Sequence, residues 1–259
     1  MKGHIERGYF GTTFFEFALQ NRSADAIIIL PDFPSRNKYD NLISLFYGRG
    51  YHVFIPRYRG SYQSGGKFLS KNIIEELAGF IDALEKGEVK SLWDMKKKEF
   101  KINRKLLIGY DFSGAIALGL AAKTQKFSHV MLIAPIWDYS VYNSENGEQD
   151  LNTISEFVKR AYKNCYRYTF KDIVKKLKKF QELKPEYYLP LLKKTPILVM
   201  HDPNDKAVPF KHTKEKLGEF DNSTYIEHYL GHEFADSLIN AHWQMIDKFI
   251  KINYIQNKT

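Results

Sequence analysis

The chain has a single cysteine, Cys165, among its 259 residues, so it cannot form an internal disulfide. A lone cysteine is typical of the reducing cytoplasm, where we expect this protein. Its uninterrupted apolar runs are far shorter than the roughly 18 residues that a membrane span needs. The N-terminal segment MKGHIERGYF lacks the apolar core of a signal peptide. We therefore expect a cytoplasmic protein with no membrane partner.

The positive charge does not gather in one place. The net charge is +9, but the lysines are spread along the chain and are not interleaved with aromatic residues in one patch. This pattern is typical of a solvated surface, and we expect no nucleic-acid partner. Apolar residues make up 44% of the chain, which suffices for a sizeable core and excludes disorder. The length suits one large α/β domain with an insertion, or two small domains.

Apolar runs alternate with helical patterns along most of the chain. Short runs of strand length occur at 26–30, 52–55, 106–108, 129–133 and 196–200, after a predicted opening hairpin at 4–9 and 12–19 and before an alternating strand at 224–230. Helical spacing occurs at 38–48, from an Asn72 cap onward, at 115–121, near 211–219 and at about 234–251. Continuous apolar strands between helices indicate a mostly parallel sheet covered on both faces.

The alternation stops after Pro135 and resumes at residue 196. Residues 136–194 contain no clear buried strand, and the stretch 171–180 has its apolar residues on one helical face. We expect a core formed by residues 1–135 and 195–259, with a helical cap insertion at 136–194. The insertion is rich in tyrosine, and packing in the core and the lid is the expected role for most of these side chains. Trp137, Tyr139 and Tyr142, at its start, are our candidates for substrate binding.

The segment KLLIGYDFSGAIALGLA, residues 105–121, carries the central motif. An apolar strand leads through Gly109 to Asp111, and Ser113 opens an Ala/Leu-rich helix. Strand, very tight turn and helix, with small residues two before and two after a central residue, form the pattern of a nucleophile elbow. The central residue projects out of the sheet, and here it is Asp111. Taken alone, Asp111 is equally consistent with a plain helix cap.

Two further motifs follow at the ends of later strands. The loop HDPNDKAVP, residues 201–209, places Asp205 shortly before Val-Pro, with Asp202 as the alternative acid. The last strand ends in Gly231 and His232, which opens onto the last helix. Alone, Asp205 is consistent with turn chemistry and His232 with a surface histidine. Rival histidines are His4, His52, His201, His212, His228 and His242.

Together these motifs resemble the α/β-hydrolase superfamily, over nearly the whole chain except the insertion. The order nucleophile, acid, histidine is that of the superfamily. An Asp at the elbow resembles the epoxide hydrolases and haloalkane dehalogenases, whereas PRYRGSYQSGGKF and the Asp-Lys-Ala-Val-Pro loop resemble prolyl-oligopeptidase-type peptidases and serine esterases. The resemblance implies Asp111 as the nucleophile and Asp205 as the residue that orients His232. It implies a small-molecule substrate and no cofactor or metal.

The oxyanion-hole region departs from the superfamily pattern. His-Gly-X-Pro usually follows the first central strand, but this chain has Pro31, Asp32, Phe33 and Pro34. The resemblance assigns the hole to the backbone N–H groups of Phe33 and Phe112. A carboxyl group at Asp32 would disfavour negative charge there. Phe112 also replaces the Trp that follows the nucleophile in dehalogenases, which argues against halide binding because an indole N–H is missing.

The physical logic favours a hydrolase that forms an ester on its own carboxylate. An ionised Asp111 attacks an electrophilic carbon without a base, and His232 then activates water to cleave the ester. Two alternatives stay open: a serine esterase or peptidase relative whose Ser has become Asp, weakly active or inactive, and a non-enzymatic binding protein on the same fold. The substrate is not apparent from the sequence, since cap and pocket shape determine it. A homodimer is also left open.

Overall fold

The computed structural model describes residues 5–35, 39–140, 150–169, 171–232 and 235–256, with side chains described as far as residue 251. The strands in this part of the chain are β1 (Glu6–Phe10), β2 (Thr13–Ala18), β3 (Ala24–Ile29), β4 (His52–Pro56), β5 (Glu88–Lys90), β6 (Lys97–Glu99), β7 (Ile102–Tyr110), β8 (His129–Ile133), β9 (Ile197–His201) and β10 (Ser223–Glu227). The α-helices are α1 (Asp40–Tyr47), α2 (Ile73–Leu84), α3 (Ser113–Thr124), α4 (Leu151–Ala161), α5 (Ile173–Leu177), α6 (Pro185–Leu192), α7 (Phe210–Leu217), α8 (Ala235–Ala241) and α9 (Trp243–Gln256). Two 3₁₀ turns complete the set, η2 (Lys163–Cys165) and η3 (Gln181–Leu183).

One eight-stranded sheet forms the centre, with strand order β1-β2-β4-β3-β7-β8-β9-β10. The strands from β4 to β10 in this order run parallel, and β1 and β2 join one edge antiparallel. The predicted mostly parallel sheet is therefore confirmed. The opening hairpin also forms as predicted, and Gly11 supplies its left-handed turn residue with φ of +57°.

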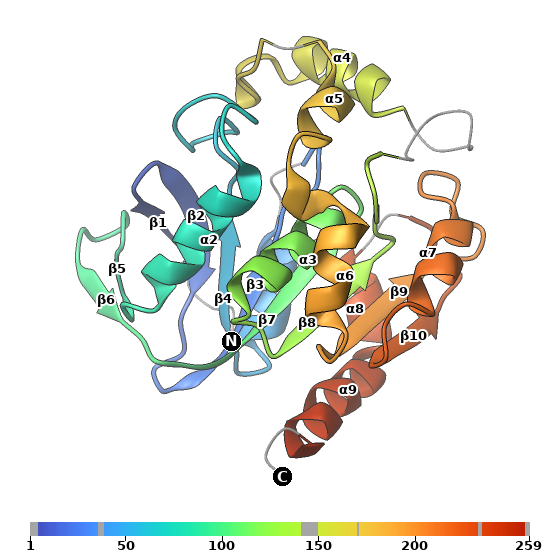
Figure 1. Ribbon diagram of the computed structural model, residues 1–259. Helices are drawn as coiled ribbons and strands as arrows, with labels where there is room; N and C mark the ends of the chain where they lie inside the picture. Colours follow the sequence, from blue (N-terminus) through green and yellow to red (C-terminus); the bar gives the residue numbers. More distant parts are fainter. Residues whose placement is uncertain (1–4, 36–38, 141–149, 170, 233–234, 257–259) are drawn as a thin grey trace.

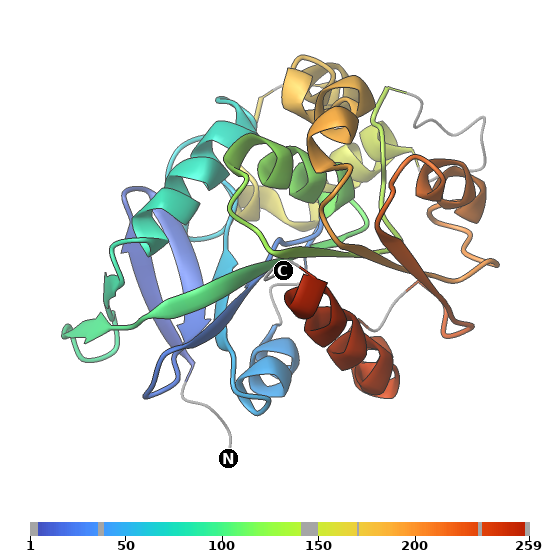
Figure 2. The same ribbon diagram turned by 60° about the horizontal axis from the view of Figure 1, so that its bottom comes forward.

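Helices cover both faces of the sheet (Figure 1). Figure 2 shows α1 and α9 on one face, and α2, α3 and α6 on the other. The strands contribute to an apolar core on each face of the sheet, because alternate side chains of a strand point to opposite faces. In β7, Leu107 joins the core beneath α2 and α3, whereas Leu106 and Ile108 join the core beneath α1 and α9.

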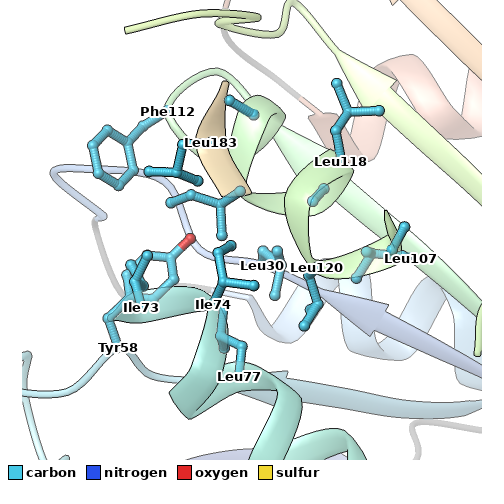
Figure 3. Packing of buried hydrophobic residues seen from close by; sticks show 14 of the residues in the cluster. Leu30, Tyr58, Ile73, Ile74, Leu77, Leu107, Phe112, Leu118, Leu120 and Leu183 are labelled. Carbon is cyan, nitrogen blue, oxygen red and sulfur yellow. The ribbon is translucent and has the colours of Figure 1, made fainter. Parts of the chain in front are cut away.

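The helix α3 is packed on several sides by buried apolar residues (Figure 3). Leu118 and Leu120 of α3 belong to one buried cluster with Ile74 and Leu77 of α2 and Leu107 of β7. The side of α3 away from the sheet is covered by α6 and η3, so the helix is buried almost all round. This burial holds the N-terminus of α3, where the elbow lies, in a fixed position.

Two expectations about secondary structure were incomplete. The Lys-rich connection after α2 contains the two-stranded hairpin β5–β6, whose strands are only three residues long and mostly charged, so they carry no apolar signal. The predicted final helix is two helices, α8 and α9, separated at His242. None of the helices in the described part of the chain is long and apolar enough to cross a membrane.

The insertion after Pro135 is helical in its described residues, which contain no strand of the central sheet. Residues around η2 pair with the loop that follows β4, since Tyr62 N–H donates to Cys165 O at 2.6 Å and Phe68 N–H donates to Arg167 O at 2.7 Å. This part of the insertion therefore lies over the carboxyl ends of the strands. In contrast, α6 packs beside α3 in the layer of helices that covers the sheet. The division into core and cap at residues 136–194 stays a prediction.

Candidate active site

Asp111 occupies a strained turn between β7 and α3. Its φ is +44°, a left-handed conformation that is uncommon for residues other than glycine and concentrated at functional sites. Backbone hydrogen bonds hold the turn: Asp111 N–H donates to Ile133 O at 3.0 Å, and its carbonyl accepts from Gly114 N at 2.9 Å and Ile136 N at 3.0 Å. Helix α3 has Phe112 as its N-cap, with no side-chain capping bond. The Asp111 side chain instead contacts His232 through Oδ2, and its Oδ1 has no hydrogen-bond partner among the described residues.

Small residues let the strand and the helix meet at this turn. A Cβ atom on Gly109 would lie 2.7 Å from the Ala117 Cβ and 2.8 Å from Ser113 O. A Cβ atom on Gly114 would lie 2.5 Å from the Pro135 Cβ. Contacts under 3.0 Å are essentially never observed for real Cβ atoms, so both positions require glycine. The sequence motif anticipated Gly109, and the structure adds Gly114.

Ser113 is the serine nearest to the elbow in sequence, but it is structural. Its side chain is fully buried, and its Oγ accepts from Tyr110 N–H at 2.7 Å and lies 3.2 Å from Leu30 O. These contacts tie the elbow to the end of β3. An internal hydroxyl held in this way does not face a substrate, so the residue available for chemistry at the elbow is Asp111.

The structure brings Asp111, Asp205 and His232 together. His232 Nδ1 lies 2.7 Å from Asp205 Oδ2, and His232 Nε2 lies 3.3 Å from Asp111 Oδ2. The side chains of Asp111 and His232 are each 19% exposed, whereas that of Asp205 is fully buried. The three residues follow β7, β9 and β10, and their strands are parallel, so they meet at one edge of the sheet.

The two acids of the β9 loop have different partners. Asp205 Oδ1 accepts from Ala207 N–H at 2.8 Å and Val208 N–H at 3.0 Å, which leaves Oδ2 for His232. Asp202 Oδ2 instead accepts from Gly231 N–H at 2.8 Å, one residue before His232. The geometry therefore pairs Asp205 with the imidazole and uses Asp202 to hold the loop that carries it.

A second histidine contacts Asp205, and the sequence argument ranked it only as a rival to His232. His201 is fully buried, and its Nε2 lies 2.9 Å from Val208 O and 3.4 Å from Asp205 Oδ2. Both of these atoms are acceptors, so Nε2 carries the hydrogen and Nδ1 accepts from Thr213 Oγ1 at 2.8 Å. Thr213 in turn accepts from Trp137 Nε1–H at 2.9 Å. The signal was present in the sequence as a histidine at a strand end, four residues before Asp205.

The carboxylates determine the charge of His232. Burial of the ring opposes protonation, but the hydrogen bonds and charges of Asp111 and Asp205 raise the pKa of His232 to about 10. Burial also opposes ionisation of Asp205, but its hydrogen bonds to His201 and His232 hold its pKa far below the usual range. At neutral pH His232 is therefore an imidazolium between two carboxylates.

The Asp32 carboxyl group contacts the two N–H groups predicted to form the oxyanion hole. Its Oδ1 accepts from the N–H of Phe33 at 2.6 Å, and it also accepts a hydrogen bond from the N–H of Phe112. The two N–H groups predicted to form the oxyanion hole do converge, but on Asp32. Burial and the charge of Asp111 raise the pKa of Asp32 well above its usual range, while the two N–H groups and His232 act the other way.

The predicted substrate-binding residues have other contacts. Trp137 and Tyr139 are buried, with Trp137 Nε1 bonded to Thr213 and the Tyr139 hydroxyl donating to Phe112 O. Tyr142 lies outside the described residues. Substrate contact by any of the three stays a prediction. Within the described ranges, no group of three or more His, Cys, Asp or Glu side chains is arranged to hold a metal ion.

Comparison with solved structures identifies the architecture. The structure of DcsB in complex with its substrate analogue is 17% identical and superposes with a TM-score of 0.70, covering 97% of this chain and 99% of DcsB. The esterase PF2001 of Pyrococcus furiosus is 15% identical, with a TM-score of 0.64 and coverage of 96% and 90%. MGS-MChE2, an α/β hydrolase from a sediment metagenome of the Mar Chica lagoon in Morocco, is 15% identical, with a TM-score of 0.59 and coverage of 99% and 100%. The chain has the α/β-hydrolase fold. Searches of protein-family models and of curated protein sequences give no match.

The α/β-hydrolase fold explains why the candidate residues meet. In open sheets of parallel strands, functional loops gather at the carboxyl ends of the strands. Asp32 follows β3 and Asp111 follows β7, and these strands are hydrogen-bonded neighbours in the sheet. The loops that carry Asp32 and Asp111 therefore lie close together, and the charge of Asp111 acts on the carboxyl group of Asp32.

Proposed function

We propose that this chain is a hydrolase of small organic substrates that works through a covalent ester on Asp111. The observation that carries the proposal is the pair of contacts of His232, 3.3 Å to Asp111 and 2.7 Å to Asp205. This geometry places His232 beside the carboxylate of Asp111, and the carboxylate of Asp205 contacts the other nitrogen of the ring. The structural neighbours support the proposal, since they include an esterase and an α/β hydrolase enzyme.

Burial distinguishes the two oxygens of the nucleophile. Asp111 Oδ1 is buried, although the side chain as a whole is 19% exposed, so Oδ2 is the oxygen that a substrate can reach. In the first step Oδ2 attacks an electrophilic carbon of the substrate. A bond forms between Oδ2 and this carbon, and the bond from the carbon to its leaving group breaks with the electron pair. The product is an ester in which Oδ1 is the carbonyl oxygen.

Ester formation itself converts His232 into a base. In the resting enzyme the charge of Asp111 helps to hold the imidazole protonated. Esterification removes that charge, so the pKa of His232 falls and the ring gives its proton to the leaving group, which for an epoxide is the alkoxide oxygen of the opened ring. The neutral ring then takes a proton from water, which attacks Cγ of Asp111, and gives it to the departing alcohol as the Cγ–Oδ2 bond breaks. Asp205 holds the ring in the required tautomer.

An epoxide or an alkyl halide is the substrate class that fits a carboxylate nucleophile. Both offer a saturated carbon with a leaving group, and neither needs a base for the attack. The side chain of Phe112 is fully buried and offers no N–H donor to a halide. An epoxide is therefore the preferred member of this class.

Intact-protein mass spectrometry tests the proposal directly. The His232→Ala variant, incubated with styrene oxide, should accumulate a covalent adduct on Asp111, because attack needs no base and hydrolysis does. Asp111→Asn should give no adduct, and His212→Ala, a histidine of α7, should behave like the wild type. In single turnover in H₂¹⁸O, the label should enter the carboxylate of Asp111, because water attacks Cγ. No adduct with styrene oxide, 1-bromobutane or 4-nitrophenyl acetate would refute the proposal.

A second candidate is an esterase relative that has lost its serine and most of its activity. The observation that favours it is the position of Asp32, whose carboxyl group occupies the N–H groups of Phe33 and Phe112. If this is correct, wild type gives no adduct and the double variant Asp111→Ser, Asp32→Gly hydrolyses 4-nitrophenyl acetate. Adduct formation by wild type or His232→Ala excludes this candidate. A non-enzymatic binding protein would show neither activity.

A further inference from the structure

The contacts of Asp32 are compatible with a neutral carboxylic acid. Its Oδ1 accepts a 2.6 Å hydrogen bond from Phe33 N–H, as the carbonyl oxygen of such a group would, and the carboxyl group also accepts from Phe112 N–H. A neutral carboxylic acid has such an acceptor oxygen and an O–H donor on the other oxygen. In the described part of the chain, no lysine or arginine forms a salt bridge with Asp32. The cation named among the main influences on the pKa of Asp32 is His232.

Asp111 Oδ1 requires a donor that the backbone does not supply. This atom is buried and has no hydrogen-bond partner among the described residues. In the proposed mechanism it becomes the oxyanion when water attacks the ester. An unpartnered oxyanion in a buried position would be strongly destabilised. The N–H groups of Phe33 and Phe112, which serve this purpose in the usual arrangement, are engaged with Asp32.

The surroundings of Asp32 favour its neutral form. Burial is the largest cause of its raised pKa, and the negative charge of Asp111 is the second. His232 and the two backbone N–H groups oppose these effects. The hydroxyls of Tyr39, Tyr58 and Tyr166 also interact electrostatically with Asp32. All of these tyrosines have raised pKa values through burial, so none adds a negative charge at neutral pH.

We propose that Asp32 is a working part of the oxyanion hole, a neutral carboxylic acid that donates its O–H to Oδ1 of Asp111. The N–H groups of Phe33 and Phe112 hold the acid in place, and the acid takes over their contact with the developing charge. This inference rests on the proposed function. It explains why a carboxyl group at the oxyanion loop is compatible with chemistry at Asp111.

The hydrogen bond strengthens where the reaction develops charge. When water attacks Cγ, the electron pair of the C=O bond moves onto Oδ1, and in the proposal the O–H of Asp32 donates to this oxygen. The pair returns when the Cγ–Oδ2 bond breaks, and the alcohol leaves with the proton that His232 took from water. Asp32 keeps its proton throughout, so the step consumes one water and needs no other reactant. A preorganised donor of this kind increases the rate by a factor of roughly 10²–10³.

Two neutral substitutions of similar size separate donation from packing. Asp32→Asn keeps an N–H donor and cannot ionise, whereas Asp32→Leu has no donor. With styrene oxide as the probe, hydrolysis of the Asp111 ester should stay within about tenfold of wild type in Asp32→Asn and fall on the order of 10²–10³ in Asp32→Leu. Wild-type hydrolysis should also decline at alkaline pH, as Asp32 loses its proton. This decline should be absent in Asp32→Asn, because an amide does not titrate.

Infrared spectroscopy reads the proton on Asp32 without any substrate. At neutral pH, the difference spectrum between wild type and Asp32→Asn should contain the C=O stretch of a protonated carboxyl group. The spectrum of Asp111→Asn should still contain this band, because Asp32 is present in that variant. Absence of the band overturns the proposal, as does an ester that Asp32→Leu hydrolyses at the wild-type rate. If no probe forms an ester in His232→Ala, both the proposed function and the role of Asp32 are refuted. If Asp32→Leu forms and hydrolyses the ester normally, only the role of Asp32 is refuted. Unfolding curves of both variants verify that they fold.

Discussion

Asp205 Oδ2 lies 2.7 Å from His232 Nδ1 and joins the loop after β9 to the loop after β10. The carboxylate side chain is fully buried and is also contacted by His201, so its position is determined by the core and not by solvent. A charge held in this way sets both the tautomer and the orientation of the imidazole.

Asp205→Asn should lower turnover of a reactive probe by roughly 10³–10⁴, because the wrong tautomer of His232 would face Asp111. The Asp111 ester should still form and should accumulate. Single-turnover mass spectrometry with styrene oxide measures both effects. Asp221→Asn, at an exposed acid in the loop before β10, is the matched control. Equal turnover in the two variants would show that Asp205 does not orient the base.

The pKa of His232 should be measurable by NMR of the imidazole nitrogens. Its two carboxylate partners raise the pKa to about 10, so the ring should stay protonated well above pH 7. In Asp111→Asn the pKa should fall, since one charge and one strong hydrogen bond are lost. A titration near the ordinary value of about 6.5 in wild type would contradict the contact with Asp111.

Stability should follow the same titration. Because the folded pKa of His232 lies above its unfolded value, its contribution to stability is fully present below about pH 6.5 and is lost as the pH rises through about 10. Urea unfolding of wild type should therefore weaken over this range more than that of Asp111→Asn. The difference between the two proteins isolates this effect from other groups that titrate at alkaline pH. Parallel curves would refute the linkage.

Asp202 should be a positioning residue for the loop that carries His232. Its carboxylate accepts from Asn204 N–H at 2.8 Å and from Gly231 N–H at 2.8 Å. Asp202→Ala leaves both donors without this acceptor and should cost about 1–3 kcal/mol in the free energy of unfolding. Asp202→Asn keeps one carbonyl oxygen and should cost less. Turnover should fall in the same order, and an alanine variant with normal turnover would show that the loop holds its position without this bond.

A pair of glycines tests the packing at the elbow. Gly114→Ala should destabilise the protein by about 1–3 kcal/mol, because its Cβ would lie 2.5 Å from the Pro135 Cβ and 2.7 Å from Ile136 O. Gly79→Ala, in the middle of α2 with nothing within 4 Å of its Cβ, should stabilise by up to about 1 kcal/mol. Both free energies come from urea unfolding. Stabilisation by both changes would contradict the close approach at Gly114.

Much of the fold followed from local patterns. The apolar runs of β3, β7, β8 and β9 are of the length and kind that a doubly covered sheet needs, and they alternate with amphipathic helices. Elements without an apolar signal were missed, as with the hairpin β5–β6, where charged residues dominate. The position of α6 was also not apparent, because its apolar residues fit a lid and a core layer equally well, and only its contact with α3 places it.

The candidate site was also predictable from the sequence only in part. The residue types, their order and their places after strands determined Asp111, Asp205 and His232 as candidates, since such motifs depend on local turns. Only the tertiary structure decided that Asp202 holds Gly231, that His201 shares Asp205 and that Asp32 occupies the N–H groups of Phe33 and Phe112. These contacts join loops that follow different strands, and no pattern in the sequence predicts which residues of separate loops will touch. Their distances, burial and charges exist only once the parallel strands have brought the loops to one edge of the sheet.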